Sequence, residues 1–158
     1  MSADVAGATL TKMRRLAAAV LIVGCASDPA VGTADWTGGP GPSALFEKSY
    51  SEPIPGGWTV KTASYDEEIH CSEVKTVGGG GLTVDLTDRA LEAVGEVLIT
   101  ADPQNPSVAS ARLRLGTTTY TDGSVSITDL DGTIRATFTA TASGGPLLTG
   151  YFDATRCP

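Results

Sequence analysis

Apolar and polar residues alternate with a period of two along the second half of the chain. Within residues 133–142, Ile134, Ala136 and Phe138 fall on one face, whereas Arg135 and a series of threonines fall on the other. This period is that of a β-strand with one buried face, and threonine suits the solvated face of such a strand. The pattern therefore predicts a half-buried strand over this segment.

The same alternation, interrupted by turn residues, predicts further short strands. We expect them at residues 58–63, 68–75, 82–86, 97–101, 109–115, 124–128 and 147–156. Asp122-Gly123, Asp131-Gly132 and Gly144-Gly145 are typical of hairpin turns. Residues 88–94 are the one segment with a plausible helical pattern, and they could equally be a bend in a strand. About seven short strands at this spacing predict an all-β fold, a single antiparallel β-sandwich or barrel-like domain.

The N-terminal segment has a different pattern. Arg14 and Arg15 precede an apolar run over residues 16–23. That run is too short for a membrane span, which needs roughly 20 apolar residues. A basic patch followed by a short apolar run is typical of a signal peptide. We therefore expect residues 1–24 to be a signal peptide, and Met13 offers a compact alternative start for it.

The apolar run ends at Ile22-Val23-Gly24-Cys25, which resembles the lipobox of bacterial lipoproteins. The resemblance implies cleavage after Gly24 and a diacylglyceryl group on the Cys25 thiol. Two acyl chains anchor a protein stably in a membrane where one does not. The expected location is therefore the extracytoplasmic side of the cell membrane. The alternative is a signal-anchor helix in which Cys25 is merely buried.

Glycine and proline dominate the segment that follows Cys25. Such a composition cannot bury enough apolar surface to offset the entropy lost on ordering. We therefore predict that residues 25–57 form a lipidated N-terminus and a flexible tether, with Trp36 exposed to solvent. The β-domain is then expected to span residues 58–158.

The remaining cysteines form an even pair. If Cys25 carries lipid, then Cys71 and Cys157 are left to each other in an exported protein, where a disulfide is the usual state. The bond would join the C-terminal strand to an early strand of the domain. The alternatives are two free thiols or a metal site with the adjacent His70, although no C-x-x-C spacing accompanies it.

The charged residues exclude several classes of function. The formal net charge is −7, which disfavours binding to nucleic acid and electrostatic docking on anionic lipid. His70 is the only histidine, and a strand would point it away from the face of Cys71, so a nucleophilic triad lacks its base. Asp129 and Asp131 lack the further ligands of a calcium loop. We expect no catalytic site, no metal and no cofactor.

Three segments together suggest a family. They are the lipobox with Cys25, the stretch from Ala101-Asp102-Pro103 to Leu113, and the late strand from Gly132 to Gly144 that precedes a terminal Cys157. In these features the chain resembles the mycobacterial 19 kDa lipoprotein antigen family, over residues 65–158 and the lipobox. The final hairpin is shorter and the tether less rich in serine and threonine, which puts mannosylation of the tether in doubt.

The resemblance implies a cell-envelope lipoprotein without enzymatic activity, whose acylated N-terminus is sensed by host Toll-like receptor 2. The expected partners are therefore the membrane and envelope or host molecules, and the oligomeric state stays open. The alternative function is an envelope carrier for a hydrophobic or lipid ligand, because small residues such as Ala111 and Ala136 leave room in the core. A closed apolar cavity of about 300 Å³ or more would favour the carrier.

Overall fold

The computed structural model describes residues 28–39, 47–64, 67–74, 81–102, 105 and 107–158. The expected signal peptide, with Gly24, and the expected lipidation site Cys25 lie outside the described residues. The described chain is almost entirely β-structure, with one short 3-10 helix, η2 (Asp88–Leu91). Its strands are β1 (Gly32–Thr37), β2 (Glu47–Ile54), β3 (Gly57–Ser64), β4 (Leu82–Thr87), β5 (Gly95–Ile99), β6 (Ser110–Leu115), β7 (Thr118–Tyr120), β8 (Asp122–Asp129), β9 (Thr133–Thr141) and β10 (Leu147–Arg156).

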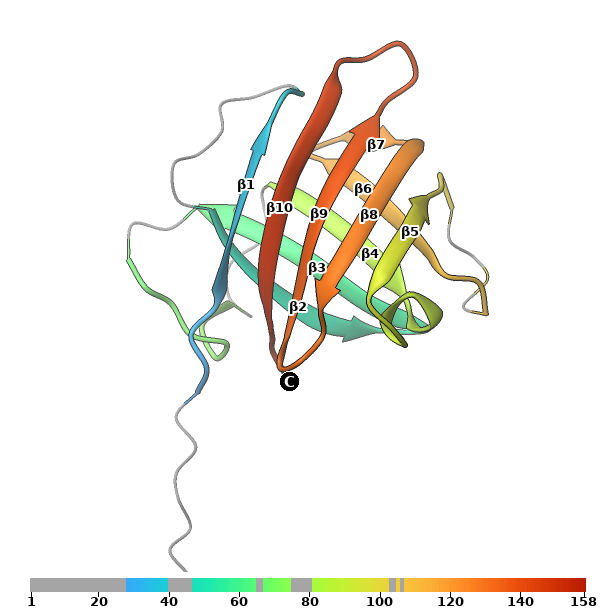
Figure 1. Cartoon of the computed structure of the whole chain (residues 1–158). Helices are drawn as coiled ribbons and strands as arrows, with labels where there is room; N and C mark the ends of the chain where they lie inside the picture. Colours follow the sequence, from blue (N-terminus) through green and yellow to red (C-terminus); the bar gives the residue numbers. More distant parts are fainter. Residues whose placement is uncertain (1–27, 40–46, 65–66, 75–80, 103–104, 106) are drawn as a thin grey trace, which may run out of the picture.

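These strands form one sheet that closes on itself (Figure 1). Around the ring the order is β4, β3, β2, β1, β10, β9, β8, β5 and β6. The ring closes because β6 pairs back with β4, from Leu82 opposite Leu115 to Leu86 opposite Ala111. Strand β7 pairs with the C-terminal part of β6 and lies outside the ring. The prediction of an all-β, barrel-like domain is confirmed.

Two short pairings in the barrel are parallel, whereas the prediction was of an antiparallel domain. Thr155 and Arg156 at the end of β10 lie beside Tyr50 and Ser51 of β2. On the other side of the ring, the end of β5 runs parallel to the start of β6, with Leu98 opposite Ser110. The remaining strand pairings are antiparallel. Both parallel contacts span only two residue pairs, so neither needs the long crossover connection of fully paired parallel strands.

The interior of the barrel is a continuous apolar core. The period-two pattern that predicted the strand over 133–142 places Ile134, Ala136 and Phe138 inside and Arg135 outside, as expected. The rings of Phe138 and Phe152 stack with centroids 6.3 Å apart across β9 and β10. The largest side chains that are fully buried in the same cluster are Tyr120, Phe152, Leu82, Leu86, Leu113, Ile127, Ile134 and Leu148.

The predicted tether is wrong for residues 28–39 and 47–57. Strand β1 pairs with β10 and β2, and β2 pairs with β3 along its whole length. Trp36 is 5% exposed and belongs to the core, whereas it was expected to lie in solvent. Burial of this indole and of neighbouring Ala34 supplies the apolar contacts that composition alone did not indicate. Residues 25–27 and 40–46 lie outside the described residues.

The segment predicted as a strand over 68–75 is instead a turn. Residues 67–74 form turns with one isolated bridge between His70 and Ala30. Ile69, Cys71 and Val74 are buried in a second apolar cluster, separate from the barrel core, with Val31, Tyr50 and Cys157. The segment is therefore held by packing and by a covalent bond rather than by a strand ladder.

The expected turns are only partly as predicted. Asp131-Gly132 and Gly144-Gly145 do connect hairpins, β8 to β9 and β9 to β10. Asp122-Gly123 forms the start of strand β8 instead of a turn. Gly123 lies so close to the backbone of β9 that an added Cβ would be 2.0 Å from the carbonyl oxygen of Thr139. The expected helical segment over 88–94 is reduced to the single 3-10 turn of η2.

Candidate functional site

A disulfide joins Cys71 to Cys157, as the sequence predicts. The two Cα atoms lie 5.3 Å apart, and each residue is 2% exposed. Backbone hydrogen bonds fix the surroundings, since the Cys71 amide donates to the Pro29 carbonyl and the Cys157 amide donates to the Ser51 carbonyl. The bond therefore locks the turn segment, the approach to β1 and the end of β10 together at one end of the barrel.

The chain is already tied to this end of the barrel at Asp28, three positions after Cys25 in the sequence. The Asp28 carboxylate accepts a hydrogen bond of 2.7 Å from the Ser72 amide. The Asp28 carbonyl lies 2.9 Å from Nδ1 of His70, which explains the position of the single histidine. His70 thus positions backbone, and its neighbour Cys71 is oxidised, so the two do not form a nucleophile and base.

Three carboxylates with hydrogen bonds or ion pairs, Asp85, Asp129 and Asp153, have structural partners. Asp85 is buried on the barrel wall, where Thr59 donates to it at 2.7 Å and Arg112 donates two hydrogen bonds to it. Asp129 accepts from the Asp131 amide at 2.9 Å, the turn chemistry expected of this pair. Among the described residues, no three His, Cys, Asp or Glu side chains gather as metal ligands would.

Surface depressions near these groups do not enclose a ligand. One of them, about 420 Å³, lies beside η2 and is lined by Asp88, Arg89, Glu92 and Ser107. Another, of about 190 Å³, adjoins the disulfide and is lined by Asp28, Cys71, Ser72 and Pro158. Both are open to the surface, unlike the closed apolar cavity that a carrier needs. Within the described chain, no helix has the length and apolar character to cross a membrane.

Two buried hydroxyls inside the barrel were missed by the sequence analysis. Tyr120 is fully buried, and its hydroxyl has no hydrogen-bond partner among the described residues. Burial raises the pKa of this phenol. Ser49 is also fully buried, and its Oγ likewise finds no partner in the described part of the chain. Ser49 lies opposite Thr62 on β3, so a small polar group occupies the inner side of β2. An alternating pattern could not reveal these hydroxyls, because they sit at positions where an apolar residue is expected.

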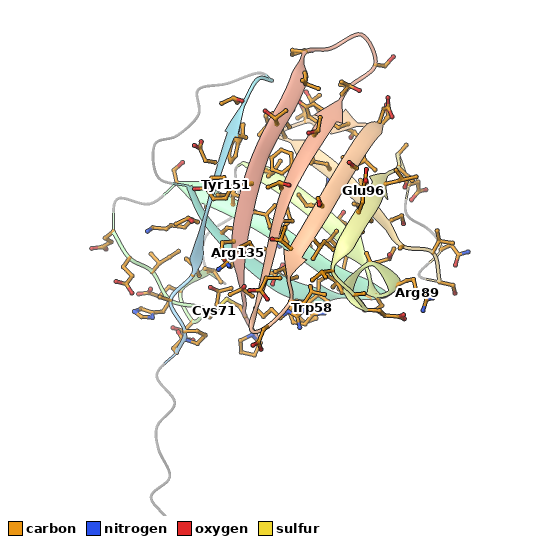
Figure 2. All side chains as sticks on the ribbon, in the orientation of Figure 1. Trp58, Cys71, Arg89, Glu96, Arg135 and Tyr151 are labelled. Carbon is orange, nitrogen blue, oxygen red and sulfur yellow. A yellow bond between two sulfur atoms is a disulfide. The ribbon has the colours of Figure 1, made fainter. Side chains whose placement is uncertain are left out.

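The outer surface of β1, β10, β9, β8 and β5 carries an ordered array of polar side chains, which we call the hydroxyl face. Strand register places these side chains in three rows across the barrel wall. The rows are Thr37, Thr149, Thr139 and Ser124, continued on β5 by the exposed Leu98; Asp35, Tyr151, Thr137, Ser126 and Glu96; and Thr33, Asp153, Arg135 and Asp129. Figure 2 shows Tyr151, Arg135 and Glu96 on the same side of the sheet.

Hydrogen bonds and charge pairs hold one end of the hydroxyl face. Arg135 donates to Asp153 at 2.8 and 3.0 Å and lies 3.6 Å from Asp129. The hydrogen bond with Asp153 and the charge of Asp153, with a smaller effect of Asp129, raise the pKa of Arg135. In the first row, the Thr37 and Thr149 hydroxyls lie 3.1 Å apart. The sequence indicated the threonines of β9, but the rows depend on a register between strands distant in sequence.

The chain was compared with known proteins at three levels. No protein-family model matches it, and no curated protein or solved structure matches it significantly.

Proposed function

We propose that the chain is a non-enzymatic lipoprotein of the cell envelope, anchored to the membrane by acyl chains on Cys25. One observation carries the proposal: Asp28, three positions after the cysteine of the lipobox-like motif, is hydrogen-bonded to the Ser72 amide at the disulfide end of the barrel. The disulfide between Cys71 and Cys157 supports an oxidising, extracytoplasmic compartment, because such bonds are rare in the cytosol. The resemblance to the mycobacterial 19 kDa lipoprotein antigen family points the same way.

The short connection defines how the anchored barrel would lie. An extended chain spans at most about 3.6 Å per residue, so the step from Cys25 to Asp28 reaches roughly 11 Å. The end of the barrel that carries Asp28, Ser72 and Pro158 would therefore lie against the bilayer surface. The barrel wall would rise from the membrane, instead of moving freely on a long spacer.

Recognition of the acylated N-terminus by host Toll-like receptor 2 is a further part of the proposal. It rests on the lipobox and on the family resemblance, because the receptor would bind the acyl chains and not the barrel. The barrel then provides the part of the protein that faces other molecules of the envelope.

Intact-mass analysis of protein from the membrane fraction tests the anchor. The wild-type chain should begin at Cys25 and carry added diacylglyceryl mass, whereas Cys25→Ala should carry none and keep its signal peptide. Ser27→Ala is the matched control, since it keeps the cysteine and should be acylated normally. Wild-type protein without acyl mass would contradict the proposal.

A carrier of a hydrophobic ligand is the second candidate, favoured by the buried and unpartnered hydroxyls of Tyr120 and Ser49. A polar atom of a largely apolar ligand could form hydrogen bonds with these hydroxyls inside the barrel. Organic extraction of purified protein, followed by mass spectrometry, tests this idea. A carrier should release a stoichiometric lipid from the wild type and less from Tyr120→Phe. If the wild type releases none, the carrier is excluded.

A further inference from the structure

We propose that the hydroxyl face binds a neutral polysaccharide chain, with Tyr151 stacked on a sugar ring and the surrounding hydroxyls bonded to sugar hydroxyls. This inference goes beyond the proposed function, because it concerns the barrel wall and does not depend on acylation of Cys25. It names a class of envelope partner from the chemistry of the face alone.

The hydroxyls of the face are available for a ligand. Ser124 and Ser126 are half-buried and alternate along β8 with the buried Val125 and Ile127. Thr137 and Thr139 are exposed, and they alternate with the buried Phe138 and Ala140. Neighbouring strands lie about 4.7–4.9 Å apart, so each row offers donors and acceptors at a regular spacing. A hydroxyl both donates and accepts, which suits a partner that is itself lined with hydroxyls.

Tyr151 supplies the apolar contact that hydroxyls cannot. Tyr151 is 43% exposed and lies in the second row between Asp35 and Thr137. Thr137 lies opposite it on β9 and Asp35 lies opposite it on β1, so polar groups flank the ring on both sides. A phenol ring has an apolar body and a polar tip, which makes it effective at interfaces that are partly apolar and partly wet. The C–H face of a pyranose ring is such a surface.

The charges of the face favour a neutral partner. Arg135 is the one cation in the three rows, and Asp153 and Asp129 compensate it. Asp35 and Glu96 stand at the two ends of the second row and are exposed. Their negative charge would repel nucleic acids and anionic polysaccharides, as would the net charge of −7. A basic peptide is the competing partner, and its binding would be electrostatic and sensitive to salt.

Affinity electrophoresis of the full chain carrying Cys25→Ala tests the proposal without acyl chains. The native gels contain, one at a time, the neutral polysaccharides laminarin, mannan, galactan and hydroxyethylcellulose. Gels with polygalacturonate supply the anionic comparison, and added polylysine supplies the cationic one. We expect at least one neutral polysaccharide to retard the protein, and the retardation to persist at high salt.

Variants assign the binding to the face. An aromatic contact of this kind contributes enough that Tyr151→Ala should weaken the interaction about five- to tenfold. The double variant Thr137→Val/Thr139→Val removes two hydroxyls at nearly constant volume and should weaken it severalfold. Thr119→Val on β7 and Ile54→Ala at the end of β2 lie outside the face and serve as matched controls. Circular dichroism of each variant separates a loss of binding from a loss of fold.

Three outcomes would overturn the proposal. One is a folded wild-type protein that none of the neutral polysaccharides retards. Another is retention by polylysine alone that disappears at high salt, which would assign the face to a basic partner. The third is an equal loss of retardation in Tyr151→Ala and in the controls. None of these outcomes bears on the proposed membrane anchor, because every chain tested carries Cys25→Ala.

Discussion

Gly150 of β10 lies opposite Trp36 of β1, so close that a Cβ at position 150 would lie 2.7 Å from the Cβ of Trp36. The same added atom would lie 2.4 Å from the carbonyl oxygen of Asp35 and 2.7 Å from the Phe138 ring. Glycine at this position therefore lets the indole of Trp36 and the ring of Phe138 enter the core side by side.

Gly150→Ala should destabilise the barrel, because the new methyl group meets backbone and ring atoms that cannot move aside. Overpacking of this kind costs about 1–3 kcal/mol of unfolding free energy. Urea unfolding followed by tryptophan fluorescence measures the loss. Gly145→Ala in the β9–β10 hairpin is the control, since its nearest contact is the Ala142 methyl at 3.2 Å and its φ is not positive. Equal stability of the two variants would contradict the close approach at Gly150.

Trp36→Ala tests whether the N-terminal strand belongs to the domain. Removal of a tryptophan that is 5% exposed should cost about 3–5 kcal/mol of unfolding free energy. A tryptophan in a flexible tether would cost almost nothing. Ile54→Ala, at an exposed site of the same N-terminal region, should change the urea midpoint little. An unchanged urea midpoint for Trp36→Ala would support the original prediction that this segment is a flexible tether.

Most strands with an ordinary alternating pattern could be predicted, whereas β1, β2 and β7 were missed. On β2, Ser49 and Ser51 face the barrel interior opposite Thr62 and Val60, whereas Tyr50 faces outward. Tyr50 is nevertheless buried, because it joins the second apolar cluster with Ile69 and Cys71. Small polar residues inside and an aromatic residue outside reverse the usual pattern. The prolines and glycines around β2 therefore led to the prediction of a flexible tether.

The disulfide followed from cysteine counting, but the hydroxyl face did not follow from any local pattern. Its rows join Thr37 near the N-terminus, Thr149 near the C-terminus and Thr139 between them. A single strand reveals which residues share a face, whereas the pairing of β1 with β10 is set by the closure of the whole barrel. The sequence therefore predicts which face of its own strand a side chain lies on, but it does not predict which side chains of other strands lie beside it.

Replacing both cysteines, as Cys71→Ala/Cys157→Ala, should lower the stability of the barrel. The two residues are 86 positions apart, and a crosslink over a loop of that length contributes about 4–5 kcal/mol on the chain-entropy model. The second apolar cluster should loosen as well, because Cys71 and Cys157 are part of it. Urea denaturation of the double variant measures the loss, with Ser72→Ala as a neighbouring control that keeps the bond. A double variant as stable as the wild type would show that packing alone holds the segment.

Tyr120→Phe should stabilise the barrel at neutral pH, by about 1 kcal/mol, since it removes a buried hydroxyl that has no partner among the described residues.

The same substitution should also change how the stability of the barrel responds to alkaline pH. Burial raises the pKa of Tyr120 above its ordinary value of 10.0, so the unfolded chain loses this proton before the folded chain does. The stability associated with the protonated phenol is present below about pH 10 and falls as the pH rises toward the folded-state pKa. Urea unfolding at a series of pH values should therefore give a shallower alkaline decline for Tyr120→Phe than for the wild type. Tyr151→Phe, at an exposed phenol, should leave the neutral-pH stability unchanged. A Tyr120→Phe curve identical to the wild type would mean that the buried hydroxyl has a partner in solution.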